Sequence, residues 1–314
     1  MKEILELNYE QNRRYRNAIS LGFFDDYEAD PRAWKHTFKG AFVWRYPSRL
    51  KQLRHLTDIV GRTPEWEDLT DDVIKDFAEE TSESMAASSA RTVCAELKAL
   101  LNANRRRVPA ADFNTVLTLR NEASQHVYLS RSEMERFIAY KPRGKAERFA
   151  YRNFCVSLMT GARLCDAKAI TIHNCDNNTG MLSYIPMKTP GIIVRVPVDE
   201  RHNLRAILSM ANIAECCLDV YNETIRTICR RIGLYEEVTV TKAGRTVTAS
   251  KWQLVSSHTA RRSFATNLFL AGISLEDVAL MMGHGKNIET TKRYICAERK
   301  VTPSVMAYFQ PEET

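Results

Sequence analysis

Residues 256–272 read SSHTARRSFATNLFLAG, and this stretch predicts a helix whose buried face contains a mismatch. Phe264, Ala265 and Leu268 follow Arg261 by three, four and seven residues, so all four share one stripe of the helix. Three of them are typical of a buried stripe, whereas Arg261 carries a guanidinium that keeps its charge in proteins. His258 lies one turn earlier, at the edge of the same face. Because a buried charge is costly unless it is compensated, the stretch predicts a site that receives an anion.

Composition and charge are typical of a globular protein with a polyanionic partner. The 314 residues suggest about two domains. Hydrophobic residues make up 44% of the chain, enough to form a buried core, and the 26% of charged residues is typical of a globular protein. The formal charge of +7 favours a nucleic acid or an acidic surface as the partner. The N-terminus lacks the apolar run of a signal peptide, and no stretch approaches the roughly 20 apolar residues of a membrane span. We therefore expect a cytoplasmic protein with no membrane partner.

The eight cysteines indicate neither a disulfide framework nor a metal site. No two of them form a C-x-x-C pair, and most have apolar neighbours along the sequence. They are typical of reduced core residues in a cytosolic protein. The sequence therefore predicts no bound metal and no cofactor.

Residues 31–120 are expected to form a helical domain. Asp30 is placed to cap a helix that has Pro31 at its first position, and Pro47 is expected to separate two helices. The last long helix ends in three consecutive arginines, Arg105, Arg106 and Arg107. These cations fit two interpretations: solvated side chains at a helix C-terminus, or contacts to DNA phosphates.

A second domain is expected after a linker at residues 121–128. Ser130 and Glu133 form a capping-box pattern at its start. Alternating residues at 181–187 and 192–198 predict a hairpin with KTPG as its turn, and a second hairpin is expected to turn at residues 243–244. The domain is otherwise expected to be helical.

Several residues of the second domain are unusual at their positions, although each has an ordinary explanation. Arg163 heads a helical stripe and could simply pair with Asp166. Lys188 could be an ordinary turn lysine, and His284 could interact with a helix terminus. Tyr294 on its own would be a core or rim aromatic. Taken together, they form an ordered set of Arg163, Lys188, His258, Arg261, His284 and Tyr294.

This ordered set resembles the tyrosine recombinase (phage integrase) family from about residue 129 to residue 300. TGARLCDAKAI at 160–170 resembles the box around the family's first arginine. SHTARRSFATNLFLAGISLEDVALMMGH at 257–284 resembles its His-x-x-Arg box through to its Gly-His, and TTKRY at 290–294 resembles the segment that ends in its nucleophile. DLTDDVIKDF at 68–77 and LKALLNANRRR at 97–107 are similar to the family's helical core-binding domain. The closest similarity is to integrases of Bacteroides-type mobile genetic elements.

The resemblance implies a mainly α fold with small β-hairpins (α+β). It divides the chain into an N-terminal extension at 1–30, a helical, SAM-like core DNA-binding domain at 31–120, the linker at 121–128, a catalytic domain at 129–300 and a C-terminal exchange tail at 301–314. About 30 residues precede the first helical block, so we expect no additional arm-binding domain. The interval from His284 to Tyr294 is ten residues, one more than expected.

The resemblance also implies a role for each residue of the set. Arg163 and Arg261 would bind the scissile phosphate, Tyr294 would attack phosphorus to form a 3′-phosphotyrosyl link, and His258 would accept its proton. Lys188 would protonate the departing 5′-oxygen, His284 would donate a hydrogen bond to a phosphate oxygen, and Asp166 would orient Arg163. Additional DNA contacts are expected from Arg105, Arg106, Arg107 and Arg262.

The implied activity is site-specific recombination of double-stranded DNA, with integration, excision or inversion as outcomes. Four protomers would assemble on two DNA sites and exchange their tails, in the bacterial cytoplasm at the nucleoid, with or without accessory proteins that bend DNA or set directionality. The alternative with the same chemistry is a type IB topoisomerase-like enzyme that nicks and closes DNA. A DNA-binding protein with a decayed site is a third class, and the complete set of catalytic residue types argues against it.

Overall fold

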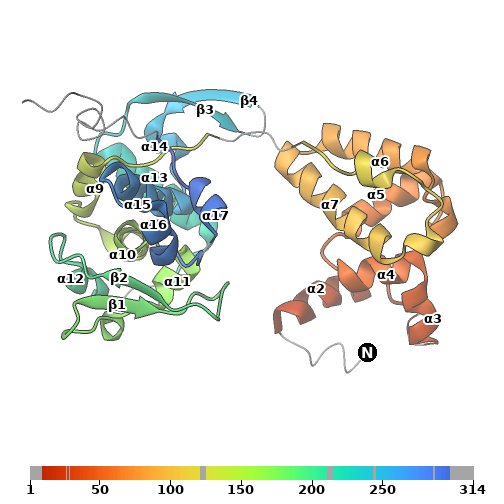
Figure 1. Ribbon diagram of the computed structural model, residues 1–314, viewed down its shortest axis with the longest axis horizontal. Coiled ribbons are helices and arrows are strands. Elements are labelled where there is room, and N and C mark those ends of the chain that lie inside the picture. Colours follow the sequence, from red (N-terminus) through yellow and green to blue (C-terminus); the bar gives the residue numbers. More distant parts are fainter. Residues whose placement is uncertain are drawn as a thin grey trace, which may run out of the picture. The chain divides into compact units, whose positions relative to one another are not determined.

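The chain divides into two units, Met1–Ala123 and Ser124–Thr314 (Figure 1). The computed structural model describes residues 9–25, 27, 29–120, 125–210, 215–242, 245–285 and 287–297. The division falls inside the segment where the sequence predicts a linker. No helix within the described ranges is long and apolar enough to cross a membrane.

The first unit is helical throughout its described residues. Its elements are α2 (Tyr9–Ser20), α3 (Pro31–His36), α4 (Phe38–Arg45), α5 (Leu50–Val60), η1 (Trp66–Asp68), α6 (Asp71–Ser84), α7 (Ala87–Ala103), η2 (Arg105–Arg107) and α8 (Phe113–Val116). The Asp30 side chain accepts hydrogen bonds from the amides of Arg32 and Ala33 at the start of α3, with Pro31 at the first helical position, as predicted. Pro47 lies between α4 and α5, also as predicted.

This helical unit begins earlier in the chain than residue 31. Helix α2 occupies part of the predicted extension, and Ala18, Phe24 and Tyr27 are buried in the unit's core. The ring of Phe24 stacks on that of Trp34 with centroids 4.8 Å apart. The sequence of α2, YEQNRRYRNAIS, is mostly polar, so the helix is ordered by aromatic packing around it rather than by a strong apolar stripe of its own.

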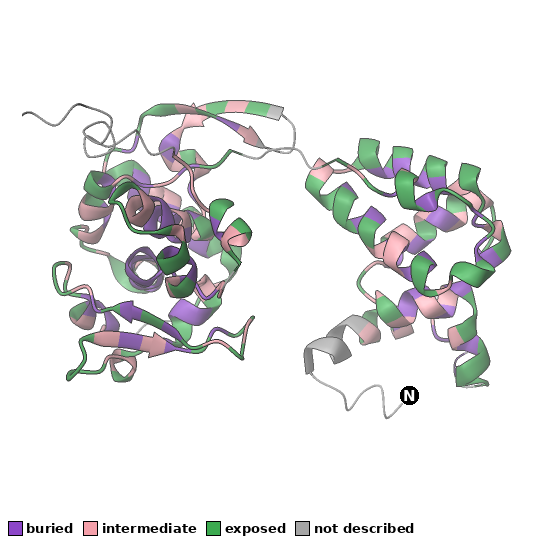
Figure 2. Ribbon diagram, viewed as in Figure 1, coloured by how far each residue is buried: buried purple, intermediate pink, exposed green. Residues whose placement is uncertain are grey.

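The second unit combines helices with two short antiparallel sheets. Its elements are α9 (Arg131–Ile138), α10 (Gly144–Thr160), α11 (Leu164–Ala169), η3 (Ile172–Asn174), β1 (Met181–Tyr184), β2 (Val194–Pro197), α12 (Leu204–Leu208), α13 (Leu218–Arg231), β3 (Glu237–Lys242), β4 (Arg245–Ser250), α14 (Lys251–Leu254), α15 (Ser257–Leu270), α16 (Leu275–Met281) and α17 (Ile288–Lys292). The mainly α fold with small hairpins is therefore confirmed. Figure 2 shows the buried residues of this unit concentrated on its central helices.

Helix α10 forms the centre of the second unit, and residues 149–160 are all buried. It packs against α13 and α15. Gly161 ends α10 in the left-handed conformation with φ +67°, and a Cβ there would lie 2.6 Å from Cδ1 of Phe264 on α15. Glycine therefore both terminates α10 and lets the chain that leads to Arg163 approach α15.

Both predicted hairpins are present, and the first has shorter strands than expected. β1 pairs antiparallel with β2, with Tyr184 opposite Val194. Pro186 lacks an amide hydrogen and cannot extend the ladder, so residues 185–193 form a wide connection that contains Lys188. β3 pairs with β4 out to Lys242 opposite Arg245, and the turn predicted at residues 243–244 lies outside the described residues.

Candidate active site

Arg261 lies on the buried stripe of α15 and is 1% exposed. Its guanidinium donates hydrogen bonds to the carbonyl oxygens of Gly161 and, at 2.6 Å, Met282. A third bond of 2.8 Å joins Nη2 to Nε2 of His284, and the guanidinium carbon lies 5.2 Å from the ring centroid of Tyr294. All of these acceptors are neutral, and within the described residues Arg261 has no ion pair with a carboxylate.

The second arginine of the site also keeps an unused hydrogen-bond donor. Arg163 occupies the N-cap position of α11, with its side chain 16% exposed. Nη1 of Arg163 and Nε of Arg261 are buried without a hydrogen-bond partner. Burial and the charge of Arg163 lower the pKa of Arg261 from its ordinary value. Two neighbouring guanidiniums with unused donors are what an anion-binding site requires.

Asp166 links Arg163 to the β1–β2 connection. Its carboxylate is buried, with Oδ2 at 4.0 Å from Nη1 of Arg163 and Oδ1 accepting a 2.8 Å hydrogen bond from the amide of Met187. The contact to Arg163 is therefore an ion contact without a hydrogen bond, whereas the contact to Met187 fixes the backbone next to Lys188. The side chain of Lys188 is exposed.

His258 stands at the start of α15 and is surrounded by cations. Its pKa is lowered from the ordinary value, first by loss of water around the ring and then by the charges of Arg262, Arg261, Arg163 and Lys188. The charge of Lys188, in the β1–β2 connection, is thus among those that act on this ring. His258 is an exposed residue overall, so the ring combines access to solvent with a preference for the neutral form.

His284 is held between Arg261 and α17. Its Nδ1 lies 2.9 Å from Oγ1 of Thr291, and burial followed by the charges of Arg261 and Arg163 lowers its pKa to about 4. A guanidinium has no acceptor, so Nε2 accepts from Arg261 and the proton of the neutral ring belongs on Nδ1. In this arrangement Nε2 does not donate, which differs from the role that the sequence suggests for it.

Tyr294 follows the short helix α17 and is partly buried. Its amide donates to the carbonyl of Thr291 at 2.8 Å, and its ring lies 5.3 Å from the ring of His284. The fold thus gathers Arg163, Arg261, His284 and Tyr294 at one place, and the charges of Arg163, Arg261 and Lys188 all act on His258. From Arg163 to Tyr294, these residues span more than 100 positions of the sequence.

The four arginines expected to make additional DNA contacts differ in how they are engaged. Arg105 donates to the carbonyl of Val108 at 2.9 Å and Arg107 donates to the carbonyl of His36 at 2.7 Å, whereas the exposed Arg106 points to no described acceptor. In the second unit, Nε of Arg262 is buried without a hydrogen bond. Neither of these carbonyls belongs to the last turn of α7, so the two hydrogen bonds are not caps of that helix.

Tyr184 is a residue of the site that the sequence analysis missed. Its hydroxyl is buried without a hydrogen bond, and burial raises its pKa to about 12 against the opposing charges of Arg261 and Arg163. The negative charge of Asp166 also raises the pKa of Tyr184. The strand pattern of β1 predicts an inward-facing residue here, but nothing in the sequence shows that it faces the arginines.

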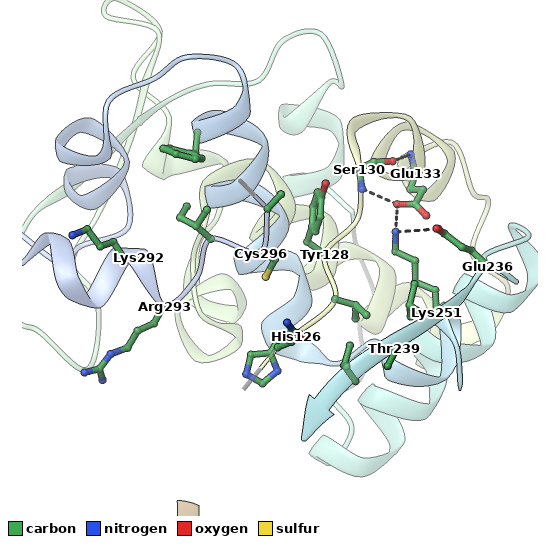
Figure 3. Close-up of a pocket in the computed structure, with 17 residues that line it drawn as sticks. His126, Tyr128, Ser130, Glu133, Glu236, Thr239, Lys251, Lys292, Arg293 and Cys296 are labelled. Carbon is green, nitrogen blue, oxygen red and sulfur yellow. Dashed lines mark hydrogen bonds and ion pairs between the residues drawn. The ribbon is translucent and has the colours of Figure 1, made fainter. Parts of the chain in front are cut away.

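A separate cavity of about 1200 Å³ lies beside the end of the described chain. Figure 3 shows Lys251 inside it between Glu133 and Glu236, at N–O distances of 2.7 and 3.8 Å. Ile295, Cys296 and Ala297 line the same cavity, and none of the six expected catalytic residues does. Within the described residues, no cluster of His, Cys, Asp and Glu could hold a metal ion.

Comparison with known proteins identifies the class to which this fold and site belong. Residues 127–300, more than half of the chain, match the model of the phage integrase family. The chain therefore belongs to the phage integrase family, whose members are the tyrosine recombinases. No curated protein matches the chain in sequence.

Solved structures support the same fold. The integrase of transposon Tn1549, in complex with a circular intermediate DNA, aligns with a TM-score of 0.58 at 15% identity and covers 83% of this chain and 90% of its own. The XerH site-specific recombinase bound to a palindromic difH substrate aligns with a TM-score of 0.54 at 13% identity, covering 84% and 75%. At this identity the likeness concerns the fold.

Proposed function

We propose that the chain is a site-specific DNA recombinase that cleaves and rejoins DNA through a 3′-phosphotyrosyl intermediate. The observation that carries the proposal is the buried guanidinium of Arg261, which has only neutral acceptors and lies against the ring of Tyr294. A phosphodiester supplies the missing anion, and the adjacent hydroxyl supplies the nucleophile.

Arg163 and Arg261 bind the non-bridging oxygens of the scissile phosphate. Each guanidinium offers a planar pair of donors, and at least one nitrogen of each is unused in the free protein. Negative charge on those oxygens grows in the pentacoordinate transition state, so cations held in place beforehand lower the barrier. Asp166 is close to Arg163 and accepts a hydrogen bond from the Met187 amide, so it holds this arginine beside the β1–β2 connection.

Tyr294 attacks phosphorus while His258 accepts the phenolic proton. The lowered pKa of His258 keeps its ring neutral at pH 7, which is the form that can accept. Lys188 gives a proton to the departing 5′-oxygen. One phosphate–oxygen bond breaks as the phosphotyrosyl bond forms, so the reverse reaction with a new 5′-hydroxyl rejoins the strand without an external energy source.

His284 takes part by exchanging partners when DNA binds. Its Nε2 accepts from Arg261 in the free protein, so a phosphate oxygen that takes over this guanidinium bond releases the imidazole. The ring then donates to the phosphate only after its proton moves to Nε2. Thr291, which bonds Nδ1, retains the ring at the site throughout.

Recombination requires an assembly of four protomers on two sites of double-stranded DNA. The first unit is proposed as the core DNA-binding domain, with the exposed Arg106 as the one of the three consecutive arginines that bonds no described residue. Residues 301–314 lie outside the described residues, and their apolar members are proposed to dock on a neighbouring protomer. The cavity described above is lined by residues 295–297, the last described residues of the chain. A bacterial mobile element and the nucleoid are the proposed setting.

Product topology tests the function. Two plasmids that carry the DNA flanking the gene are incubated with the wild-type protein and with Tyr294→Phe, and the products are resolved before and after denaturation. Strand exchange with a covalent protein–DNA adduct for the wild type alone is the expected result. Relaxation without exchange supports the topoisomerase-like alternative, and an adduct formed by Tyr294→Phe shows that another residue is the nucleophile.

Truncation after Lys300 tests the assembly. We expect binding to a single site to persist while the pairing of two sites and recombination are lost, because the exchanged tail links protomers. A gel-shift with one and with two sites measures both. Normal pairing by the truncated protein contradicts tail exchange.

A further inference from the structure

Thr266 bonds the main chain on both sides of residue 295. It lies on α15 and is completely buried. Its Oγ1 donates to the carbonyl oxygen of Tyr294 at 3.2 Å and accepts from the amide of Cys296 at 3.0 Å. One hydroxyl thus satisfies two backbone groups of the segment that presents the tyrosine.

Besides Thr266, the amides of Tyr294 and Ile295 bond back to the end of α17, and both side chains pack against the core. Helix α17 ends at Lys292, and residues 293–297 belong to no helix or strand. The amide of Tyr294 is bonded to the carbonyl of Thr291, but its carbonyl has only Thr266 and the Cys296 thiol, at 3.5 Å, as described donors. Unpaired backbone groups in a partly buried segment would favour other conformations.

Thr266 stands on the same helix as Arg261, five residues further along. With a rise of 1.5 Å per residue, the two positions are about 7.5 Å apart along the axis. The ring of Tyr294 reaches back over the guanidinium of Arg261, while its backbone is bonded to Thr266. One rigid helix therefore holds both the phosphate-binding cation and the main chain of the nucleophile.

We infer that Thr266 is a positioning residue for Tyr294, fixing the tyrosine over the arginines of its own chain. This inference rests on the proposed function of Tyr294. Thr266 acts through the nucleophile's backbone, so it governs how often the phenol stands in line with phosphorus rather than how tightly DNA binds. Small misplacements of a reacting group can cost about a hundredfold in rate.

Ser263 provides a matched control on the same helix. It is also completely buried, and its Oγ donates to the carbonyl of Thr259 at 2.7 Å and accepts from the amide of Leu129 at 2.8 Å. Its inter-segment bond ties α15 to residue 129, not to the nucleophile. Removing this hydroxyl costs the fold a comparable pair of hydrogen bonds and leaves the restraint on Tyr294 in place.

The test compares Thr266→Val, Thr266→Ser and Ser263→Ala in the full-length protein. Three quantities are measured: DNA affinity, the single-turnover rate of covalent complex formation on a nicked site, and thermal unfolding. We expect Thr266→Val to cleave at least about tenfold more slowly at unchanged affinity, and the hydroxyl of Thr266→Ser to restore most of the rate. Ser263→Ala is expected to lower the unfolding temperature but not the rate.

Three results would overturn the inference. They are wild-type cleavage by Thr266→Val, failure of Thr266→Ser to recover the rate, and a loss for Ser263→Ala that equals that of Thr266→Val. If the valine variant does not fold, Thr266→Ala provides a second variant without the hydroxyl. A wild-type rate for Thr266→Val refutes the positioning role alone, whereas an adduct formed by Tyr294→Phe refutes the proposed function.

Discussion

Replacing Arg261 by lysine is expected to damage both the fold and the reaction, whereas Arg163→Lys is expected to damage the reaction alone. Arg261 bonds two carbonyls, of Gly161 and Met282, through different nitrogens, and also bonds His284. A lysine ammonium is a single point and cannot reach all three acceptors. Arg163 has a buried nitrogen without a partner and only a 4.0 Å contact to Asp166.

The magnitudes follow from these contacts. Leaving one buried carbonyl without a donor costs about 1–3 kcal/mol, so Arg261→Lys should lose roughly 2–4 kcal/mol once the contact over the tyrosine ring is included. Arg163→Lys should lose less than about 1 kcal/mol, because the ammonium keeps a charge beside Asp166 and the 4.0 Å contact that it replaces is too long for a hydrogen bond. Both variants lose a bidentate hydrogen bond to the phosphate in the transition state, worth roughly 3 kcal/mol or about a hundredfold in rate.

Two measurements separate the effects. Native-state hydrogen exchange of the amides of α10 and α15 reports the stability of the second unit within the full-length chain. Single-turnover cleavage of a nicked site, at protein concentrations above the Kd, reports the rate. The reasoning is refuted if Arg261→Lys is as stable as the wild type, or if both variants lose equal stability. Losses of affinity that match the losses of rate would show that the arginines only anchor DNA.

Three further predictions concern the proton acceptor, the hydroxyl at Tyr184 and metals. The pKa of His258 is lowered from 6.5, so its neutral form persists as the pH falls through 6.5. The single-turnover cleavage rate should therefore decline only below pH 6.5. A decline that begins above pH 6.5 contradicts the assignment of His258 as the proton acceptor. Tyr184→Phe should slow cleavage without weakening DNA binding, since its buried hydroxyl faces the arginines, whereas Tyr221→Phe removes another buried, unbonded hydroxyl and should leave the rate unchanged. Cleavage should continue in excess EDTA, because arginines carry the charge; loss of cleavage with EDTA and its return with Mg²⁺ would refute that mechanism.

Local patterns in the sequence predict much of this fold. The cap at Asp30, the break at Pro47 and the two hairpins are each set by residues close together in the chain, and the structure confirms them. Helix α2 is the exception. Its polar sequence carries a weak signal, because its Tyr15 packs against the rings of Phe24 and Trp44 from other parts of the unit.

The site divides in a similar way between what the sequence can and cannot reveal. Arg261 is conspicuous because a charge on an apolar stripe conflicts with the local pattern. Thr266 and Tyr184 fit the local sequence pattern, since a threonine in a helix and a tyrosine in a strand are both common. Their importance comes from which distant atoms they meet, and this requires the folded chain. The direction of the bond between Arg261 and His284 is equally hidden, because it depends on which ring nitrogen carries the proton.

The helical geometry of α15 also fixes the spacing of the residues that it carries. His258, Arg261 and Thr266 are spaced along one continuous helix, so inserting a single residue among them would rotate everything beyond it by about 100° and separate the tyrosine from the cation beneath it. The stretch from His284 to Tyr294 contains turns and the short helix α17, and such connections absorb an extra residue by changing shape. We therefore expect length changes to be tolerated between residues 284 and 294 and to be damaging between residues 258 and 266.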